Sequence, residues 1–190
     1  MDAAADAAAR VETLTIATRT KRATQIAANS DVDVAFRPFG APLAFLAACA
    51  KIGVKTTCGE QVKTAPAEAR TTTKDGKVDV SGAIDALEAL EDACEGTGLL
   101  GAGSAAREEV FEWLTRCRSL APGGGFEKQC EGVNEYLATR TYLVGHDVTL
   151  ADLALWAEFT TNRQWAVVEK EGKCGNLARW LATMNADAET

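Results

Sequence analysis

The sequence predicts an α+β fold in which a small β-α-β domain is followed by a bundle of helices. Three observations favour this fold. Short strand patterns flank an alanine-rich helix pattern within residues 32–58. A glycine-rich segment, residues 96–103, then divides the chain. Beyond it, apolar residues recur every three or four positions, which is the spacing of a helix that buries one face.

The first half begins with a pattern typical of a β-α-β unit. Residues 32–36 and 54–58 read as short strands. We expect a buried helix over residues 43–52, because this run is apolar and rich in alanine. Pro42 suits the first turn of that helix, and Gly53 is placed to end it. The two strands should therefore be parallel.

A hairpin and a second helix are expected next. Residues 68–80 carry an Asp75-Gly76 pair between two strand-like runs, which favours a tight turn. Ser81 is a candidate N-cap for a helix that runs to about Cys94. The resulting order, β-α-β-β-β-α, fits a reduced thioredoxin-like domain.

The second half reads as a helical bundle with short connections. Ser104 can cap its first helix. Pro122 and the glycines after it should end that helix. Five helices are expected, at residues 104–121, 126–139, 149–160, 165–171 and 176–186.

The helix at 149–160 carries the most specific local signal. Thr149 and Asp152 form a capping box, in which each side chain bonds the backbone N–H of the other residue. Val148 and Leu153 supply the matching hydrophobic staple. Apart from Asp152, residues 150–157 are all apolar, which indicates a buried helix. We therefore expect Thr149 and Asp152 to be a structural cap in the centre of the bundle.

These patterns divide the chain into four parts. The parts are a flexible N-terminal extension at 1–31, a thioredoxin-like domain at 32–95, a linker at 96–103 and a helical domain at 104–186. Residues 13–30 are rich in Thr and Arg and slightly resemble an organelle transit sequence. Asp2, Asp6 and Glu12 favour a cytosolic extension instead. We expect a cytoplasmic protein.

Composition excludes several functional classes. The net charge of −7 argues against direct nucleic-acid binding, which needs clustered Lys and Arg. No apolar run approaches the ~18 residues of a membrane helix. The six cysteines form no C-x-x-C pair and the only histidine, His146, is adjacent to none of them, so we expect no metal site and no cofactor. The cysteines read as reduced thiols.

The text of the helical half resembles a known family. It reads N-E-Y-L-A-T-R-T-Y-L-V-G-H-D-V-T-L-A-D-L-A-L-W-A, followed by N-L-A-R-W-L at 176–181. A buried S/T-x-x-D helix start after Y-L-V-G looks like the helical half of the glutathione-transferase fold. The two quoted segments taken together resemble the N-terminal transferase-like domain of eukaryotic cytosolic glutamyl-tRNA synthetases. Related domains occur in other synthetases, in their scaffold proteins and in subunits of elongation factor 1.

The resemblance also says what glutathione chemistry would require. An active transferase needs a hydroxyl or thiol near the first strand–helix turn, but residues 37–43 offer neither. It needs a cis-proline before the third strand, for which Pro66 is a candidate. It needs an acid or amide before a serine at a helix start, where this chain has Val80 and Ser81. We therefore expect no catalytic residues, although a divergent glutathione transferase stays an alternative.

The family resemblance implies a docking role instead. The chain carries no H-I-G-H-like or K-M-S-K-S-like text, so it cannot charge tRNA by itself. The implied partner is another transferase-like domain, on a synthetase scaffold or a tRNA-binding cofactor. Arg140 and Thr141 are candidate partner-binding residues, and the exposed side of helices 81–95 and 104–121 is a second candidate surface. A domain of an elongation factor 1 subunit is a further alternative. His146 reads as a solvated loop residue.

Overall fold

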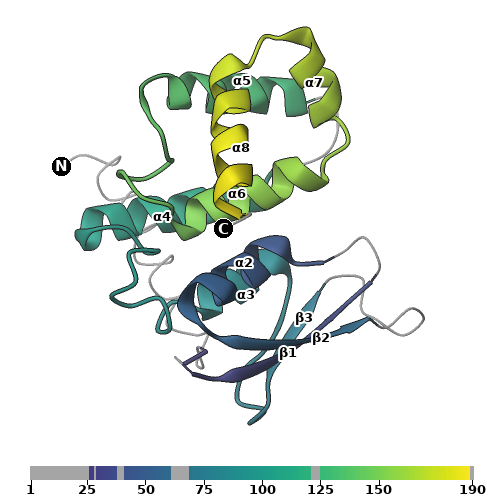
Figure 1. The fold of residues 1–190 in the computed structure, drawn as a ribbon, viewed down its shortest axis with the longest axis vertical. Helices are drawn as coiled ribbons and strands as arrows, with labels where there is room; N and C mark the ends of the chain where they lie inside the picture. The colour runs from purple at the N-terminus through teal and green to yellow at the C-terminus, as the bar shows by residue number, and fades with distance from the viewer. Residues whose placement is uncertain (1–25, 28, 38–40, 61–68, 121–124, 189–190) are drawn as a thin grey trace, which may run out of the picture.

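A computed structural model describes residues 26–27, 29–37, 41–60, 69–120 and 125–188. Figure 1 shows two layers of structure, a sheet with two helices on one face and a bundle of helices above them. The predicted α+β fold is confirmed. The predicted extension at 1–31 stays a prediction for residues 1–25, which lie outside the described ranges. Ile26 is fully buried, and its N–H donates to the carbonyl of Ala89 (2.6 Å).

The first half contains a mixed four-stranded sheet in the order β2-β1-β3-β4. Its strands are β1 (Asp31–Phe36), β2 (Lys55–Glu60), β3 (Arg70–Thr73) and β4 (Asp79–Ser81). β1 and β2 are parallel, while β3 runs antiparallel to both β1 and β4. The parallel pair and the hairpin about Asp75-Gly76 are as predicted. Val32 and Val34 point into the core from β1, because alternate residues of a strand share one face.

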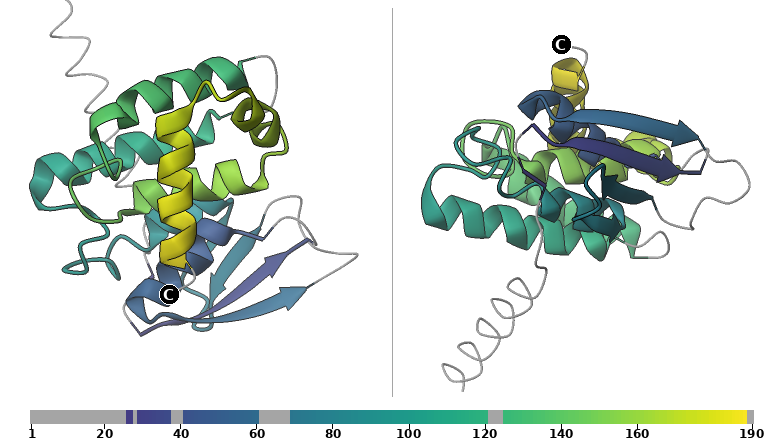
Figure 2. Two further views of the ribbon diagram at one scale, coloured as in Figure 1. Left: turned by 45° about the horizontal axis from the view of Figure 1, so that its top comes forward. Right: turned by 90° about the horizontal axis from the view of Figure 1, so that it is seen from below.

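Helices α2 (Leu43–Ile52) and α3 (Ala83–Ala89) lie between the sheet and the helical bundle (Figures 1 and 2). α2 begins directly after Pro42 and ends at Gly53, whose φ of 72° is the left-handed conformation that glycine adopts without strain. The predicted start and end of this helix are therefore confirmed within one residue.

Two predicted caps are wrong. Ser81 ends strand β4, where it pairs with Arg70, and Gly82 takes the N-cap position of α3 with a φ of 99°. That backbone conformation suits glycine and leaves the serine side chain exposed. Ser104 lies inside the first turn of its helix, since Ala102 is the N-cap residue. Neither helix start has a side-chain cap. The predicted helix to Cys94 also ends early and continues as turns.

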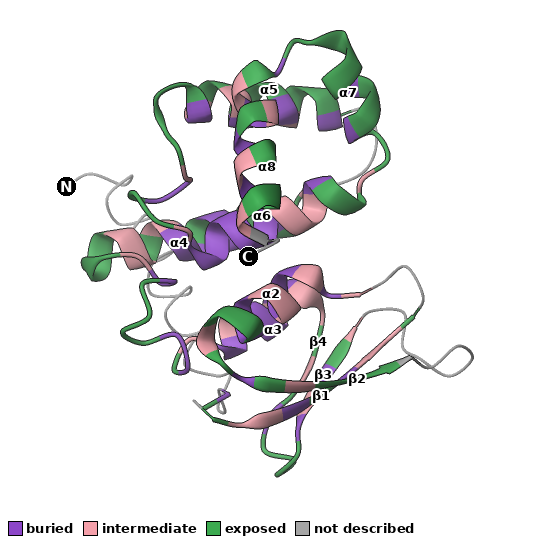
Figure 3. Cartoon of the chain, in the orientation of Figure 1, coloured by how far each residue is buried: buried purple, intermediate pink, exposed green. Residues whose placement is uncertain are grey.

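The second half contains the predicted helices in the predicted order. They are α4 (Gly103–Arg118), α5 (Phe126–Tyr136) with a 3-10 turn at Leu137–Thr139, α6 (Leu150–Thr161), α7 (Trp165–Glu171) and α8 (Gly175–Ala188). α6 crosses the centre of the molecule, with α2 and α4 packed against it. Figure 3 shows the middle of α4 and α6 as the most continuously buried part of the bundle.

One apolar core runs through both halves. Phe45 on α2 and Leu155 on α6 are each fully buried, and they belong to the same cluster of core residues. α6 is buried around most of its circumference, as the apolar residues at 150–157 other than Asp152 predict. No helix of the described ranges combines the length and the apolar character needed to cross a membrane.

Two arginines on α4 tie the halves together at the surface. Arg107 forms ion pairs with Glu91 (2.7 Å) and Glu95 (2.9 Å), which lie in the turns after α3. Arg118, three turns further along α4, pairs with Asp85 (2.6 Å) and Glu88 (2.9 Å) on α3. Each guanidinium bridges two carboxylates, so these pairs hold the α3 region against α4.

Candidate interaction site

The start of α6 is a buried hydrogen-bond network centred on Asp152. The predicted capping box with Thr149 is present. Asp152 Oδ2 accepts from the N–H (3.0 Å) and the hydroxyl (2.8 Å) of Thr149. Asp152 Oδ1 accepts from the N–H of Leu143 (2.8 Å) and from the indole N–H of Trp180 (3.1 Å). Asp152 therefore joins three segments: the loop before α6, the start of α6 and helix α8.

These four bonds explain how a carboxylate is tolerated in the core. Asp152 is fully buried, and burial raises the pKa of its carboxyl. The four hydrogen bonds that it accepts oppose that shift, because they favour the charged form. Sequence reasoning found the capping box with Thr149. It missed the bonds from Leu143, in the loop before α6, and from Trp180 on α8.

Tyr136 fixes the other side of the same loop. Its hydroxyl lies within hydrogen-bonding distance of the Leu143 carbonyl (2.8 Å) and of Glu109 Oε1 on α4 (2.5 Å). Burial and the Glu109 carboxylate raise the pKa of this hydroxyl, so it stays protonated as a donor. Leu143 is thus bonded through its N–H to Asp152 and through its carbonyl to Tyr136. These two bonds anchor the Y-L-V-G loop to the start of α6 and to α5.

Arg140 lies at the exposed corner beside this loop. Its guanidinium lies over the Tyr136 ring, 4.1 Å from the ring centre, and donates to the Tyr136 carbonyl (3.1 Å). The cation–π contact and this bond restrict the side chain while it stays exposed. Thr141 is also exposed. A restricted, exposed cation loses little entropy when it meets an anionic partner group.

The structure adds Arg179 to this corner. Its guanidinium donates to the carbonyls of Leu137 (2.8 Å) and Arg140 (2.9 Å) from helix α8. Sequence reasoning missed it, because Arg179 is 39 residues from Arg140 and follows no local pattern. Two guanidinium groups therefore share one corner of a chain whose net charge is −7.

The positions that would handle glutathione are only partly described. Pro66 and residues 38–40 lie outside the described ranges, so the proline requirement stays untested. Ser81 is exposed at the end of β4, and Val80 beside it carries no polar side chain. His146 is exposed, as expected for a loop residue. Within the ranges that the structure describes, no three His, Cys, Asp or Glu side chains gather in a way that could hold a metal ion.

The six cysteines differ sharply in exposure. All six are free thiols, and Cys58 on β2 is the exposed one. Burial raises the pKa of Cys49 to about 12 and that of Cys94 to about 11. Because the thiolate is the reactive form, these buried thiols should be inert at neutral pH.

We therefore expect a single thiol, that of Cys58, to react rapidly with a thiol reagent in the native protein. Ellman's reagent at pH 8 should label one thiol rapidly, and Cys58→Ser should remove that phase. Labelling of all six should require denaturant. A fast phase of two or more thiols in the native wild type would contradict the buried placement of the other five.

A family model for the glutathione S-transferase C-terminal domain matches residues 125–188. A solved structure on yeast aminoacyl-tRNA synthetase complex formation is similar over 82% of this chain and 87% of its own, with a TM-score of 0.58 and 19% identity. Poplar glutathione transferase F1 is similar over 81% of this chain and 92% of its own, with a TM-score of 0.60 and 12% identity. The chain therefore has a glutathione-transferase-like fold.

The matches to curated proteins point to a narrower group than the fold does, namely glutamate–tRNA ligases. The cytoplasmic glutamate–tRNA ligase of Arabidopsis thaliana is 34% identical over 74 residues, which are 38% of this chain and 10% of the ligase. The bifunctional glutamate/proline–tRNA ligase of Cricetulus griseus is 30% identical over 92 residues, which are 47% of this chain and 6% of that protein. The match thus spans a tenth or less of these relatives. It confirms the resemblance to eukaryotic glutamate–tRNA ligases.

Proposed function

We propose that this chain is a non-catalytic docking domain of a glutamyl-tRNA synthetase. It would hold the synthetase in a complex with another transferase-like domain, on a synthetase scaffold or a tRNA-binding cofactor. The similarity to glutamate–tRNA ligases supports this role, and the ligase of Arabidopsis thaliana is named as cytoplasmic. We propose the same compartment here. The domain would bind protein and leave contact with tRNA to its neighbours.

The observation that carries the proposal is a transferase fold without the side chains for glutathione chemistry. Residues 37–43 contain no hydroxyl or thiol to lower the pKa of a bound thiol. Where the family resemblance places the γ-glutamyl group, the Val80 side chain has no hydrogen-bonding atom, and Ser81 ends strand β4 instead of starting a helix. The helical half, by contrast, keeps a fully bonded buried cap at Asp152. The maintained fold and these missing side chains together support a binding role.

Two surfaces are candidates for docking, and charge favours the corner of Arg140, Thr141 and Arg179. Among the residues that the structure describes, these two exposed guanidinium groups contact carbonyls and an aromatic ring and no carboxylate, which leaves their charge available to an acidic partner. On the α3–α4 side, Arg107 and Arg118 already pair with carboxylates of the same chain. Complementary charge at the corner would set the register of the partner.

Arg140→Glu should weaken partner binding by about tenfold or more, because the variant places like charge against an acidic partner surface. The full tagged chain and this variant would be used to purify partners from extract of the source organism. Mass spectrometry should find a synthetase or scaffold protein with a transferase-like domain on the wild type. Lys51→Glu, an exposed change of the same charge on α2, should retain that protein.

The outcome distinguishes the surfaces. Tryptophan fluorescence should show that Arg140→Glu is folded, since its side chain is exposed. If both variants retain the partner equally, the corner is not the docking site. If the wild type retains no protein of the translation machinery, the docking role itself is wrong.

A divergent glutathione transferase is the alternative from another class. We expect no turnover of glutathione with 1-chloro-2,4-dinitrobenzene above the uncatalysed rate, and no retention on immobilised glutathione. A domain of an elongation factor 1 subunit is a second alternative. Reading the gene beyond Thr190 separates it from the synthetase, since H-I-G-H-like text would follow only in the latter.

A further inference from the structure

Two of the buried thiols, Cys130 and Cys174, lie where helix α5 meets the start of α8. Cys130 is in the middle of α5, and Cys174 directly precedes Gly175, the first residue of α8. Both are free thiols, with exposed fractions of 0% and 3%. The two residues are distant in the chain, so only the packing of the helices brings them together.

One face of α5 contacts the segment that contains Cys174. Glu127, Cys130 and Asn134 follow one another at steps of three and four residues, so they share this face. At its first end, Glu127 pairs with Lys173, the residue directly before Cys174, and Lys173 Nζ lies 3.0 Å from Glu127 Oε1. This ion pair fixes one end of the contact.

Asn134 fixes the other end by bonding to the first turn of α8. Its Oδ1 accepts from the N–H of Asn176 (2.9 Å) and from the N–H of Leu177 (3.2 Å). Asn134 therefore caps α8 from another helix, because the first N–H groups of a helix have no partner within it. The contacts follow the same order on both segments. Cys130 and Cys174 are the middle positions, and they face each other between the two contacts.

The electrostatics of the two thiols agree with this arrangement. Burial raises the pKa of the Cys130 thiol to about 12, and the neighbouring Cys174 adds to the increase. Burial also raises the pKa of the Cys174 thiol, and so do Glu131 and Glu127, which flank Cys130 on α5. Both thiols are therefore protonated at neutral pH in the closed structure. Because the thiolate is the reactive form, they react only when the structure opens.

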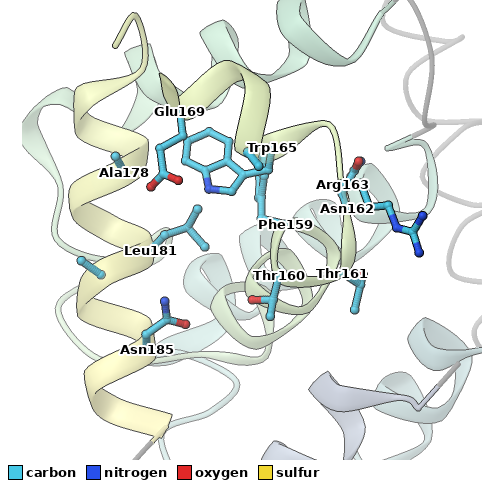
Figure 4. Close-up of a pocket in the computed structure, with 12 residues that line it drawn as sticks. Phe159, Thr160, Thr161, Asn162, Arg163, Trp165, Glu169, Ala178, Leu181 and Asn185 are labelled. Carbon is cyan, nitrogen blue, oxygen red and sulfur yellow. The ribbon is translucent and has the colours of Figure 1, made fainter. Parts of the chain in front are cut away.

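The segment around Cys174 is a place where the structure can open locally. It joins α7 to α8, and Gly172, Lys173 and Gly175 within it are exposed. A groove of about 400 Å³ lies between the end of α6, α7 and α8, so α7 does not pack closely along α8 (Figure 4). Both partners in the ion pair of Lys173 are more than half exposed, and such pairs contribute little stability. Local opening should therefore expose Cys174 before Cys130.

We propose that Cys130 and Cys174 are a redox-sensitive pair, which a small-molecule disulfide oxidises to a bond that fastens the start of α8 to α5. Cys174 loses its proton and attacks one sulfur of the oxidant, so that a mixed disulfide forms and one thiolate leaves. Cys130 then loses its proton and attacks the Cys174 sulfur, which closes the internal bond and releases the second thiolate. The protein loses two electrons and two protons, and the oxidant becomes two thiols.

The bond restrains the segments that carry the basic corner. Arg179 is in the second turn of α8, and it donates to the carbonyls of Leu137 and Arg140, which follow α5. This inference goes beyond the docking role proposed above. Its test uses no partner protein, so its failure would leave that role untouched.

The test uses the full chain with Cys58→Ser, because Cys58 is the exposed thiol and would itself react with the oxidant. The protein is equilibrated at pH 8 with 2-hydroxyethyl disulfide and 2-mercaptoethanol, quenched with acid, alkylated in denaturant and cleaved with trypsin without reduction. Mass spectrometry should find one internal disulfide, between peptides 129–140 and 174–179, each of which has a single cysteine. Dithiothreitol should return both thiols.

Matched variants locate the bond. Oxidation should raise the melting temperature of the Cys58→Ser chain by about 5–10 °C, because the bond restrains the unfolded chain. Adding Cys130→Ala or Cys174→Ala should abolish both the cross-link and this shift. Adding Cys117→Ala, which removes a buried thiol of α4, should retain both. Each comparison is between the oxidised and reduced forms of one variant, so a loss of stability caused by the substitution itself does not affect it.

Three results would overturn the proposal. One is the absence of the link between peptides 129–140 and 174–179 when the oxidant is in excess. Another is a similar yield of links between other cysteines, because that would indicate oxidation of an unfolded chain. The third is an equal melting temperature of the oxidised and reduced forms, because the bond would then not fasten α8 to α5.

Discussion

Asp152→Ala is expected to lower the free energy of unfolding by about 4 kcal/mol, the sum of a lost cap and of buried donors left without acceptors. The carboxylate accepts four hydrogen bonds in the core. Its removal leaves the N–H of Leu143 and the indole N–H of Trp180 unpaired. It also removes the hydrogen bond that joins α8 to the start of α6. A loss of this size is a large share of the stability of most domains.

Urea unfolding of the full chain, followed by tryptophan fluorescence, would measure this change. Asp147→Ala is the matched control, because Asp147 is an exposed acid in the loop before the same helix. We expect the control to change stability by less than about 0.5 kcal/mol. The stability of Asp152→Asn should lie between those of Asp152→Ala and Asp147→Ala. The amide oxygen can still accept hydrogen bonds, but the amide N–H groups face the donors of Thr149. Equal stability of Asp152→Ala and Asp147→Ala would show that the network does not hold the bundle together.

Phe45→Ala is expected to cost about 3–5 kcal/mol, which is typical of deleting a fully buried aromatic ring. This loss of stability should be detected in the half of the molecule that does not contain Phe45. Phe45 belongs to α2 of the sheet half, whereas all four tryptophans, at positions 113, 156, 165 and 180, belong to the helical half. Because α2 packs against α6, the two halves share one core. A change in the first half should therefore destabilise the second.

Tryptophan fluorescence reports on the helical half alone, so it tests this coupling directly. In Phe45→Ala the fluorescence midpoint in urea should fall together with the far-UV circular dichroism midpoint, as in a two-state transition. Lys51→Ala, at an exposed position of the same helix, should leave both midpoints in place. If the fluorescence midpoint is unchanged in Phe45→Ala while circular dichroism shows a second, earlier transition, the halves unfold independently.

Local patterns predicted most of the fold, because the determining residues are neighbours in the chain. The run of apolar residues after Thr149, interrupted only by Asp152, indicated a buried helix, and α6 is that helix. The Asp75-Gly76 pair placed the hairpin correctly. The same kind of signal failed at Ser81 and Ser104. A serine before a helix pattern indicates a cap, but the chain leaves β4 through a positive φ at Gly82, and α4 begins one residue before Ser104.

The candidate sites could be predicted only in part, because they depend on contacts between distant segments. Arg140 was found from its place beside the Y-L-V-G text, but its stacking on Tyr136 and its neighbour Arg179 needed the packed bundle.

The central claim is that a transferase-like fold serves here to bind a protein and not to process glutathione. Hydrogen–deuterium exchange of the full chain, alone, with glutathione and with the protein retained in purification, tests it most directly. We predict that the retained protein slows exchange at residues 137–142 and in α8, and that glutathione changes no segment. Slower exchange with glutathione around residues 41–46 and 79–83, with no protection by the retained protein, would contradict the account.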